Sequence, residues 1–168
     1  LVDFLPAIGL GFAEVGSVTA RPSEGNPPPR LFRLPDDEAL VNRLGLNNDG
    51  AQAIATRLRG RAFEFPLGIN IAKTNDDSIV GAEAVEDLRA AWRRVADIGD
   101  FHVLNISCPN TADGRTFEDR KALEELLAGM EPTRPLFLKI SPDLEPGSVE
   151  EIVRACEGRP VSGFVLTN

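Results

Sequence analysis

Histidine, cysteine and tyrosine are scarce in this sequence, and their scarcity limits the kinds of metal site, disulfide and catalytic group that it can form. The 168 residues include one histidine, His102, two cysteines, Cys108 and Cys156, and no tyrosine. Two cysteines are too few for a disulfide framework, which favours a reducing cytosol. Because the cysteines lie far apart and the histidine is single, the usual spacing of metal ligands is absent and no metal site is expected. A hydrolase triad would have to use His102.

Excess positive charge and long apolar runs are also missing. The formal net charge is −8, which argues against a general nucleic-acid binder or a polybasic membrane module. No apolar run approaches the roughly 18 residues of a membrane-spanning helix. The opening stretch contains Asp3 and no basic region, so a signal peptide is not expected. The chain starts at Leu1 and stops just after an apolar run, so we expect both ends to be cut.

Short apolar runs alternate with amphipathic stretches along the chain. From residue 66 onward the apolar runs begin roughly 26–35 residues apart, the length of a strand, a helix and a right-handed crossover. This alternation predicts an α/β fold with a buried parallel sheet, either a (β/α)8 barrel or an open doubly wound sheet. A barrel normally needs ~250 residues, so this would be a partial barrel of about five strands. The expected strands are 12–20, 66–73, 101–107, 135–141 and 162–168, and the expected helices are 82–98, 117–130 and 147–157.

Residues 21–35, RPSEGNPPPRLFRLP, are rich in proline and interrupt this alternation. Five prolines and Gly25 make a helix or an inner strand improbable here. We expect a surface loop, with recognition of a polyproline stretch by a partner as the alternative. Since Arg30 and Arg33 alternate with Leu31 and Phe32, the loop is expected to fold back against the body.

Polar residues recur late in the expected strands. One such residue could be a satisfied core group, but five corresponding places on five strands suggest a ring around one pocket, where parallel strands end. Amide side chains there suit a planar ligand rich in C=O and N–H groups. His102 lies near a strand start, and we expect it to be structural. Redox chemistry would need a borrowed cofactor. The residues of the ring are Gly16, Ser17, Asn70, Asn105, Lys139, Thr167 and Asn168, with Cys108 and Asn110 close by.

Five blocks of the sequence resemble one family, the dihydroorotate dehydrogenases, and in particular their class 2, quinone-linked branch. The block at 14–50, EVGSVTARPSEGNPPPRLFRLPDDEALVNRLGLNNDG, is highly specific. The others follow in the family's order, and the resemblance covers essentially the whole chain. The other four blocks are PLGINIAKT (66–74), LNISCPNT (104–111), LFLKISPDL (136–144) and GFVLTN (163–168).

The resemblance implies an FMN-dependent (β/α)8 barrel that oxidises dihydroorotate to orotate in pyrimidine biosynthesis. Cys108 falls on the position of the catalytic base. The implied FMN contacts are Gly16, Ser17, Asn70, Asn105, Lys139 and Thr167. The implied contacts to the substrate ring or its carboxylate are Asn42, Gly45, Asn105, Asn110 and Asn168. The implied partners are dihydroorotate or orotate and an electron acceptor, with quinone favoured.

Several positions depart from the class 2 pattern. That class usually has serine where Cys108 stands, and the loop 111–119 also differs from its pattern. The family as a whole usually has glycine at Ala72 and a bulkier residue at Leu44. Cysteine as the base is the class 1 choice. The physiological acceptor therefore stays open between quinone and another oxidant.

We expect residues 1–168 to form a partial FMN-binding barrel domain that lacks the family's first and last barrel segments. An open partial barrel exposes strand edges and apolar faces, so the isolated chain should bind FMN weakly and tend to self-associate. Two alternatives remain: another FMN barrel acting on pyrimidines, similar to dihydropyrimidine dehydrogenase, and a catalytically silent half-barrel. The expected location is the cytoplasm, with peripheral contact to the inner membrane through a segment outside this sequence left open.

Overall fold

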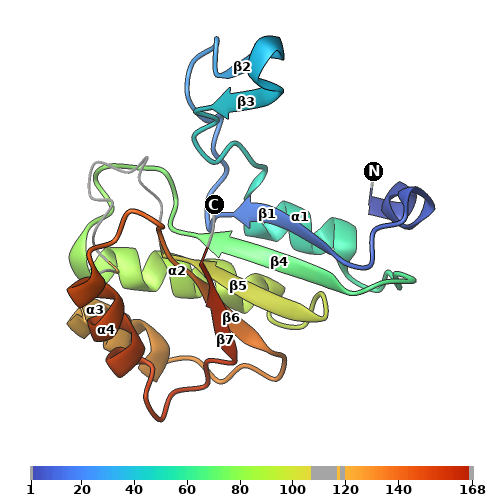
Figure 1. Ribbon diagram of the computed structural model, residues 1–168. Coiled ribbons are helices and arrows are strands. Elements are labelled where there is room, and N and C mark those ends of the chain that lie inside the picture. Colours follow the sequence, from blue (N-terminus) through green and yellow to red (C-terminus); the bar gives the residue numbers. More distant parts are fainter. Residues whose placement is uncertain (1, 107–116, 118–119, 167–168) are drawn as a thin grey trace.

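Five parallel strands in the order β1-β4-β5-β6-β7 form the central sheet of the computed structural model, which describes residues 2–106, 117 and 120–166 (Figure 1). The strands of this sheet are β1 (Ala13–Val18), β4 (Leu67–Ala72), β5 (Phe101–Asn105), β6 (Leu136–Lys139) and β7 (Gly163–Val165). The helices are α1 (Gly50–Leu58), α2 (Gly81–Val95), α3 (Arg120–Ala128) and α4 (Pro146–Ala155), with short 3-10 helices at Val2–Ile8 (η1) and Pro35–Asp37 (η2). A separate antiparallel pair joins β2 (Leu31–Leu34) and β3 (Ala39–Asn42).

The order of the sheet decides between the two expected architectures. The five strands lie side by side in chain order, and α2, α3 and α4 lie together on one side of them (Figure 1). A doubly wound sheet would reverse its strand order at a switch point and carry helices on both faces. The predicted partial barrel of five strands is therefore confirmed, and each strand begins and ends within a few residues of its expected range.

The core lies between the sheet and these helices. Leu67, Ile69 and Ile71 alternate along β4 and are fully buried. The apolar stripe of α2 includes Val85 and Leu88, which are buried as the helical spacing predicted. Burial of such side chains contributes roughly 1.5–3 kcal/mol each, so the core fixes which face of each strand meets the helices.

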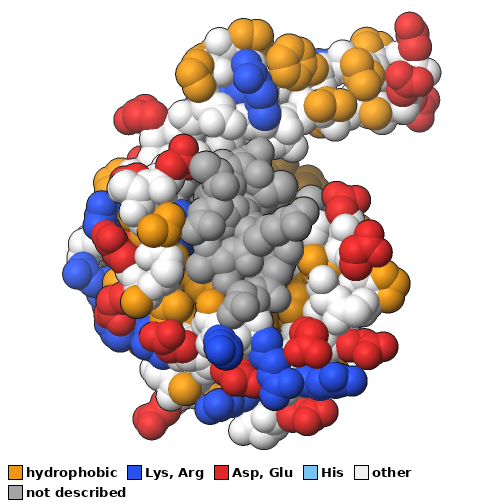
Figure 2. Space-filling model, turned by 90° about the vertical axis from the view of Figure 1, so that its left-hand side faces the viewer, with side chains coloured by type: hydrophobic (Ala, Val, Ile, Leu, Met, Phe, Trp, Pro, Cys, Tyr) orange, Lys and Arg blue, Asp and Glu red, His pale blue; other side chains and the backbone are white. Residues whose placement is uncertain are grey.

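The expectation for residues 21–35 is partly wrong. Residues 31–34 form β2, which pairs with β3 in a hairpin that projects from the body instead of folding back on it (Figure 1). The hairpin lies outside the central sheet, so the expectation that this segment forms no inner strand of that sheet is correct. Hydrophobic side chains along it stay exposed, and acidic ones gather at its end (Figure 2). Those exposed by more than a third include Leu31, Phe32, Leu34, Leu40 and Val41.

Three phenylalanines form a row across the amino-terminal half of the sheet, on the face away from the helices. The rings of Phe12 and Phe101 lie 6.3 Å apart, and those of Phe101 and Phe137 lie 5.9 Å apart, both edge to face. Gly68 pairs with Phe101 across the strands, and a Cβ at Gly68 would lie 2.2 Å from a Phe101 ring carbon. Glycine is therefore required for this close packing.

We predict that Gly68→Ala lowers the free energy of unfolding by about 1–3 kcal/mol, because the new methyl group must displace the Phe101 ring. Chemical denaturation of the full-length protein measures the change. Gly147→Ala is the matched control, since its Cβ would meet open space and it lies in a helix. The double variant Gly68→Ala/Phe101→Leu should recover part of the loss. Equal stability of the Gly68 and Gly147 variants would contradict the packing argument.

Candidate functional site

Strand register gathers polar side chains at the carboxyl ends of the central strands. Ala72 pairs with Asn105, and Asn105 pairs with Lys139. Residues paired in this way point to the same face of a sheet, and residues next along each strand point to the other. Leu104 and Leu138 are fully buried on the helix side. Asn105 and Lys139 therefore lie on the opposite face, which is the inner face of a barrel.

A directional chain of hydrogen bonds joins three strands on this inner face. The Ser17 hydroxyl on β1 donates to Asn70 Oδ1 on β4 at 2.6 Å. Asn105 Nδ2 on β5 donates to Ser17 Oγ at 3.4 Å. Asn70 Nδ2 donates to Glu14 Oε1 at 2.7 Å. We call Glu14, Ser17, Asn70 and Asn105 the amide chain.

Glu14 sets the direction of the amide chain. A carboxylate only accepts hydrogen bonds, so Asn70 must turn its nitrogen to Glu14 and its oxygen to Ser17. The Ser17 hydroxyl therefore donates its proton to Asn70, and the Ser17 oxygen accepts the hydrogen bond from Asn105. Sequence reasoning missed Glu14 as a site residue. No pattern in the sequence singles it out.

Gly16 sits beside the amide chain and has a conformation that other residues rarely adopt. Its φ is +135°, and a Cβ there would lie 2.4 Å from the Asn70 carbonyl oxygen. Glycine thus allows β1 to approach β4 closely at the point where Ser17 reaches Asn70. Its backbone is exposed, so a ligand could also approach it.

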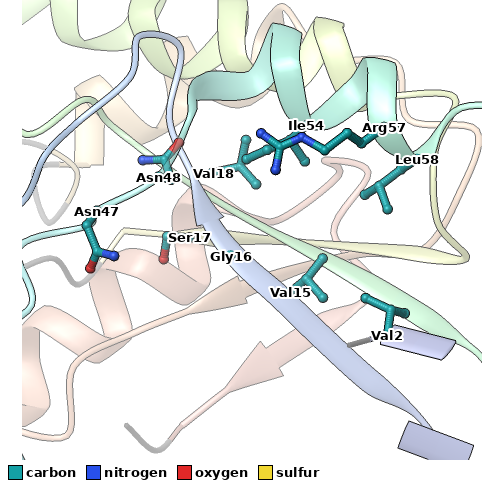
Figure 3. Close-up of a pocket in the computed structure, with 10 residues that line it drawn as sticks. All are labelled: Val2, Val15, Gly16, Ser17, Val18, Asn47, Asn48, Ile54, Arg57 and Leu58. Atoms are coloured by element: carbon teal, nitrogen blue, oxygen red, sulfur yellow. The ribbon is translucent and has the colours of Figure 1, made fainter. Parts of the chain in front are cut away.

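A cavity of about 250 Å³ adjoins Gly16 and Ser17 (Figure 3). Asn47, Asn48 and Ser17 lie toward one end of it, and Val2 and Leu58 lie toward the other. The remaining lining residues are Val15, Val18, Ile54 and Arg57. Apolar walls with a few polar groups, here including the charged Arg57, are typical of sites for organic molecules.

Asn42 and Gly45 lie at the hairpin and its base. Asn42 is the last residue of β3 in the projecting hairpin, and its Oδ1 accepts the Leu44 backbone N–H at 3.4 Å. The Gly45 carbonyl oxygen accepts a hydrogen bond from Asn75 Nδ2 at 3.0 Å, which ties the base of the hairpin to the loop after β4. The expected part of Asn42 and Gly45 in substrate binding stays a prediction.

Four expected site residues, Cys108, Asn110, Thr167 and Asn168, lie outside the described residues. The other cysteine, Cys156, caps the carboxyl end of α4 and is half-buried, and burial raises the pKa of its thiol to about 11. A thiol with that pKa is protonated at neutral pH and is a poor nucleophile. Within the described residues, no group of three or more His, Cys, Asp or Glu side chains could hold a metal ion.

His102 is a structural residue, as expected. Its Nε2 lies 3.1 Å from the Val95 carbonyl oxygen and 3.0 Å from that of Ile98, so Nε2 carries the proton and donates to both. The side chain is buried on the helix side of β5. This burial lowers its pKa from the ordinary value of 6.5, which keeps the ring neutral.

A family model and individual relatives of known name identify the same protein family. A family model described as dihydroorotate dehydrogenase matches residues 2–168. The chain is 45% identical over 168 residues to the dihydroorotate dehydrogenase (quinone) of Haloarcula marismortui, covering 99% of this chain and 47% of that protein. It is 44% identical over 167 residues to an enzyme of the same name from Thermus thermophilus, covering 96% of this chain and 48% of that protein.

Solved structures agree with these sequence matches. The ligand-free dihydroorotate dehydrogenase of Eimeria tenella matches with a TM-score of 0.79 and 32% identity over 95% of this chain and 52% of that one. The same enzyme in complex with ferulenol matches with a TM-score of 0.82 and 30% identity over 96% of this chain and 50% of that one. The chain spans about half the length of the relatives that it matches. Within the described residues, the helices are too short or too polar to cross a membrane.

We predict that Glu14→Ala lowers the free energy of unfolding by about 1–3 kcal/mol, because it leaves the buried Asn70 amide nitrogen without its acceptor. Glu14→Gln should cost less, since its carbonyl oxygen still accepts. Denaturation of the full-length protein measures both. Glu131→Ala, at an exposed position, is the control and should change stability by less than about 0.5 kcal/mol. The role of Glu14 would be refuted if its alanine variant matched that control.

We predict that stability falls as the pH drops below the unfolded-state pKa of His102, 6.5. The folded state holds the ring neutral, so only the unfolded state gains the proton in this window, and the slope is at most about 1.4 kcal/mol per pH unit. His102→Gln removes this term. Its stability should therefore depend less steeply on pH between about 7.5 and 5.5, as measured by urea denaturation. Parallel profiles for the two proteins would show that His102 does not titrate on unfolding.

Proposed function

Because this chain belongs to the dihydroorotate dehydrogenase family, we propose that it carries the central part of the site that oxidises dihydroorotate to orotate with FMN in pyrimidine biosynthesis. The observation that carries the proposal is the amide chain, which crosses β1, β4 and β5, has Ser17 and Asn105 at or near the carboxyl ends of their strands, and has Lys139 on the same face. Carboxyl ends of parallel strands are where barrel enzymes place their chemistry. Residues 1–168 are accordingly proposed as a partial FMN-binding domain.

The described residues fit a flavin. A flavin ring presents C=O and N–H groups along one edge, which amide and hydroxyl side chains can match. Gly16 offers exposed backbone without a side chain beside Ser17. The proposed contacts are Gly16, Ser17, Asn70, Asn105, Lys139 and Thr167. When bound, FMN supplies the acceptor for the hydride that leaves C6 of dihydroorotate.

The protein's own groups would position the substrate and handle charge. The Lys139 ammonium group would stabilise negative charge that develops beside it during the reaction. Asn42, Asn105, Asn110 and Asn168, with Gly45, would hold the pyrimidine so that its C5 and C6 hydrogens face their acceptors. Asn105 is suited to this because the amide chain directs its nitrogen toward Ser17, so the orientation of its amide is set before a ligand arrives.

Cys108 is proposed as the base that takes the proton from C5. It follows Asn105 by three residues, just beyond the end of β5. A thiol of ordinary pKa near 8.5 is a better base at neutral pH than a serine hydroxyl. Proton removal by Cys108 and hydride loss from C6 together form the C5=C6 double bond of orotate.

Quinone is the proposed oxidant, because the relatives of highest similarity reported above are named for it. Their names also favour dihydroorotate oxidation over the chemistry of dihydropyrimidine dehydrogenase or a silent half-barrel. The protein would contact a lipophilic quinone at the surface of the inner membrane, on its cytoplasmic side. The net charge of −8 gives no support to nucleic acid as a partner.

Anaerobic titration of the full-length protein with dihydroorotate tests the proposal. The purified protein should contain FMN, lose its yellow absorbance when dihydroorotate is added, and regain it with a soluble quinone. A flavin-loaded protein that dihydroorotate fails to bleach would refute the proposed reaction. A protein that binds no FMN at all would refute the proposed domain.

We predict that Cys108→Ala slows flavin reduction by dihydroorotate roughly a hundredfold or more, the usual scale of general-base catalysis. Stopped-flow absorbance measures the rate, which in the parent should rise with pH across the thiol titration. FMN and orotate binding should be largely retained. Cys156→Ala is the matched control and should leave the rate unchanged. Reduction at the parental rate in the Cys108 variant would place the base elsewhere, with Ser107 the next candidate.

A further inference from the structure

A second cavity lies at the opposite end of the sheet from the amide chain. It measures about 370 Å³ and is formed where three loops meet, before β4, before β5 and before β6. The loop from α1 contributes residues 58–63, the loop from α2 contributes residues 97–100, and Arg134 completes the wall. Three arginines and two aspartates line it, so its net charge is positive. We call it the arginine cavity.

Two of the three arginines already have carboxylate partners. Arg59 forms a two-pronged ion pair with Asp97, with N···O distances of 3.0 and 3.1 Å. This contact holds the pKa of Asp97 below its ordinary value. Arg61 pairs with Asp3 of η1, which lies outside the cavity lining. The Asp100 carboxylate accepts the Leu67 backbone N–H at 2.8 Å and so helps to fix its own loop.

Arg134 is the arginine of this cavity that forms no ion pair with the described residues. Its Nη2 donates to the Asp97 backbone oxygen at 3.3 Å. Its Nε is buried and has no hydrogen-bond partner, and no carboxylate of the described part of the chain lies within 4.0 Å of it. The Arg134 side chain is only partly buried and lines the cavity, so a bound oxyanion can pair with its guanidinium fork.

The rest of the cavity suits a flat organic group. Leu58, Phe63 and Ile98 supply its apolar wall. The Arg61 guanidinium lies 5.2 Å from the centre of the Phe63 ring, which fixes that ring in place. The volume of about 370 Å³ falls at the lower end of the range of small-molecule sites, roughly 300–1,000 Å³. An inorganic ion alone would leave the apolar wall unused.

We propose that the arginine cavity binds a small ring-bearing organic oxyanion, with its phosphate or carboxylate on Arg134 and its ring against Phe63. The site is separate from the proposed flavin site and does not depend on the proposed function. Residues from three consecutive helix–strand connections meet in it, so an occupant would tie together the amino ends of β4, β5 and β6.

Isothermal titration of the full-length protein as purified tests this, and a second titration with saturating orotate identifies any binding of the probes at the proposed substrate site. The probes are phenyl phosphate, benzoate and inorganic phosphate. Phenyl phosphate or benzoate should bind with a dissociation constant in the millimolar range or tighter, and inorganic phosphate more weakly. Tighter binding of phenyl phosphate would indicate a phosphate site, and tighter binding of benzoate would indicate a carboxylate site. No binding of either aromatic probe at about ten millimolar would overturn the proposal.

Variants separate the two halves of the site. Arg134→Met should weaken binding of the better aromatic probe about tenfold or more, and Arg134→Lys should give an intermediate loss because it keeps the charge without the fork. Phe63→Leu should weaken the aromatic probes but not inorganic phosphate. Arg154→Met is the matched control, since Arg154 pairs with Glu150 and Glu151 on α4 away from the cavity. Unchanged binding in the lysine and leucine variants would overturn the proposal even if the methionine variant failed to fold.

Discussion

The pairing register of β4, β5 and β6 is the constraint on which the remaining structure depends. It places Ala72, Asn105 and Lys139 in one row, and the pleat then sends the residues next to them to the helix side. The buried leucines and isoleucines of those neighbouring positions pack against α2 and α3. A shift by one residue would expose that core and bury the polar row. The same packing energy that stabilises the fold therefore holds the site side chains on the inner face.

Most of the sheet could be predicted from sequence, because its strands are apolar runs at regular spacing. The hairpin and α1 could not be predicted in the same way. Residues 31–34 follow a run of prolines, and β2 gains its regular structure only by pairing with β3, which no local pattern reveals. Residues 50–58, GAQAIATRL, are dominated by small side chains, so their apolar stripe is weak. Tertiary contact with α2 and β1 compensates for it.

The site shows the same division between local and tertiary information. Asn70, Asn105 and Lys139 could be predicted because a polar residue within an apolar strand is costly unless it has a partner or a role. Glu14 has no such signal, since a glutamate on an edge strand is ordinarily a solvated residue. Its importance appears only when β1 pairs with β4 and brings it within 2.7 Å of the Asn70 amide. Glu14 is therefore part of the site because of the register between β1 and β4, and not because of the composition of its own strand.

The amide chain is also ordered in the absence of a ligand, which is what the proposed flavin site requires. Two of its three hydrogen bonds join the adjacent strands β1 and β4, and the third joins β5 to β1, the two strands that flank β4. Glu14 accepts only, so the direction of every donor along the chain is set before anything binds, and a ligand need not reorient the amides. Such preorganisation lowers the entropic cost of binding. The arginine cavity lacks this feature, because it contains Arg134, which forms no ion pair with the described residues. The two ends of the sheet thus differ in kind: the polar side chains at one end bond to one another, and an arginine at the other end has no carboxylate partner among the described residues.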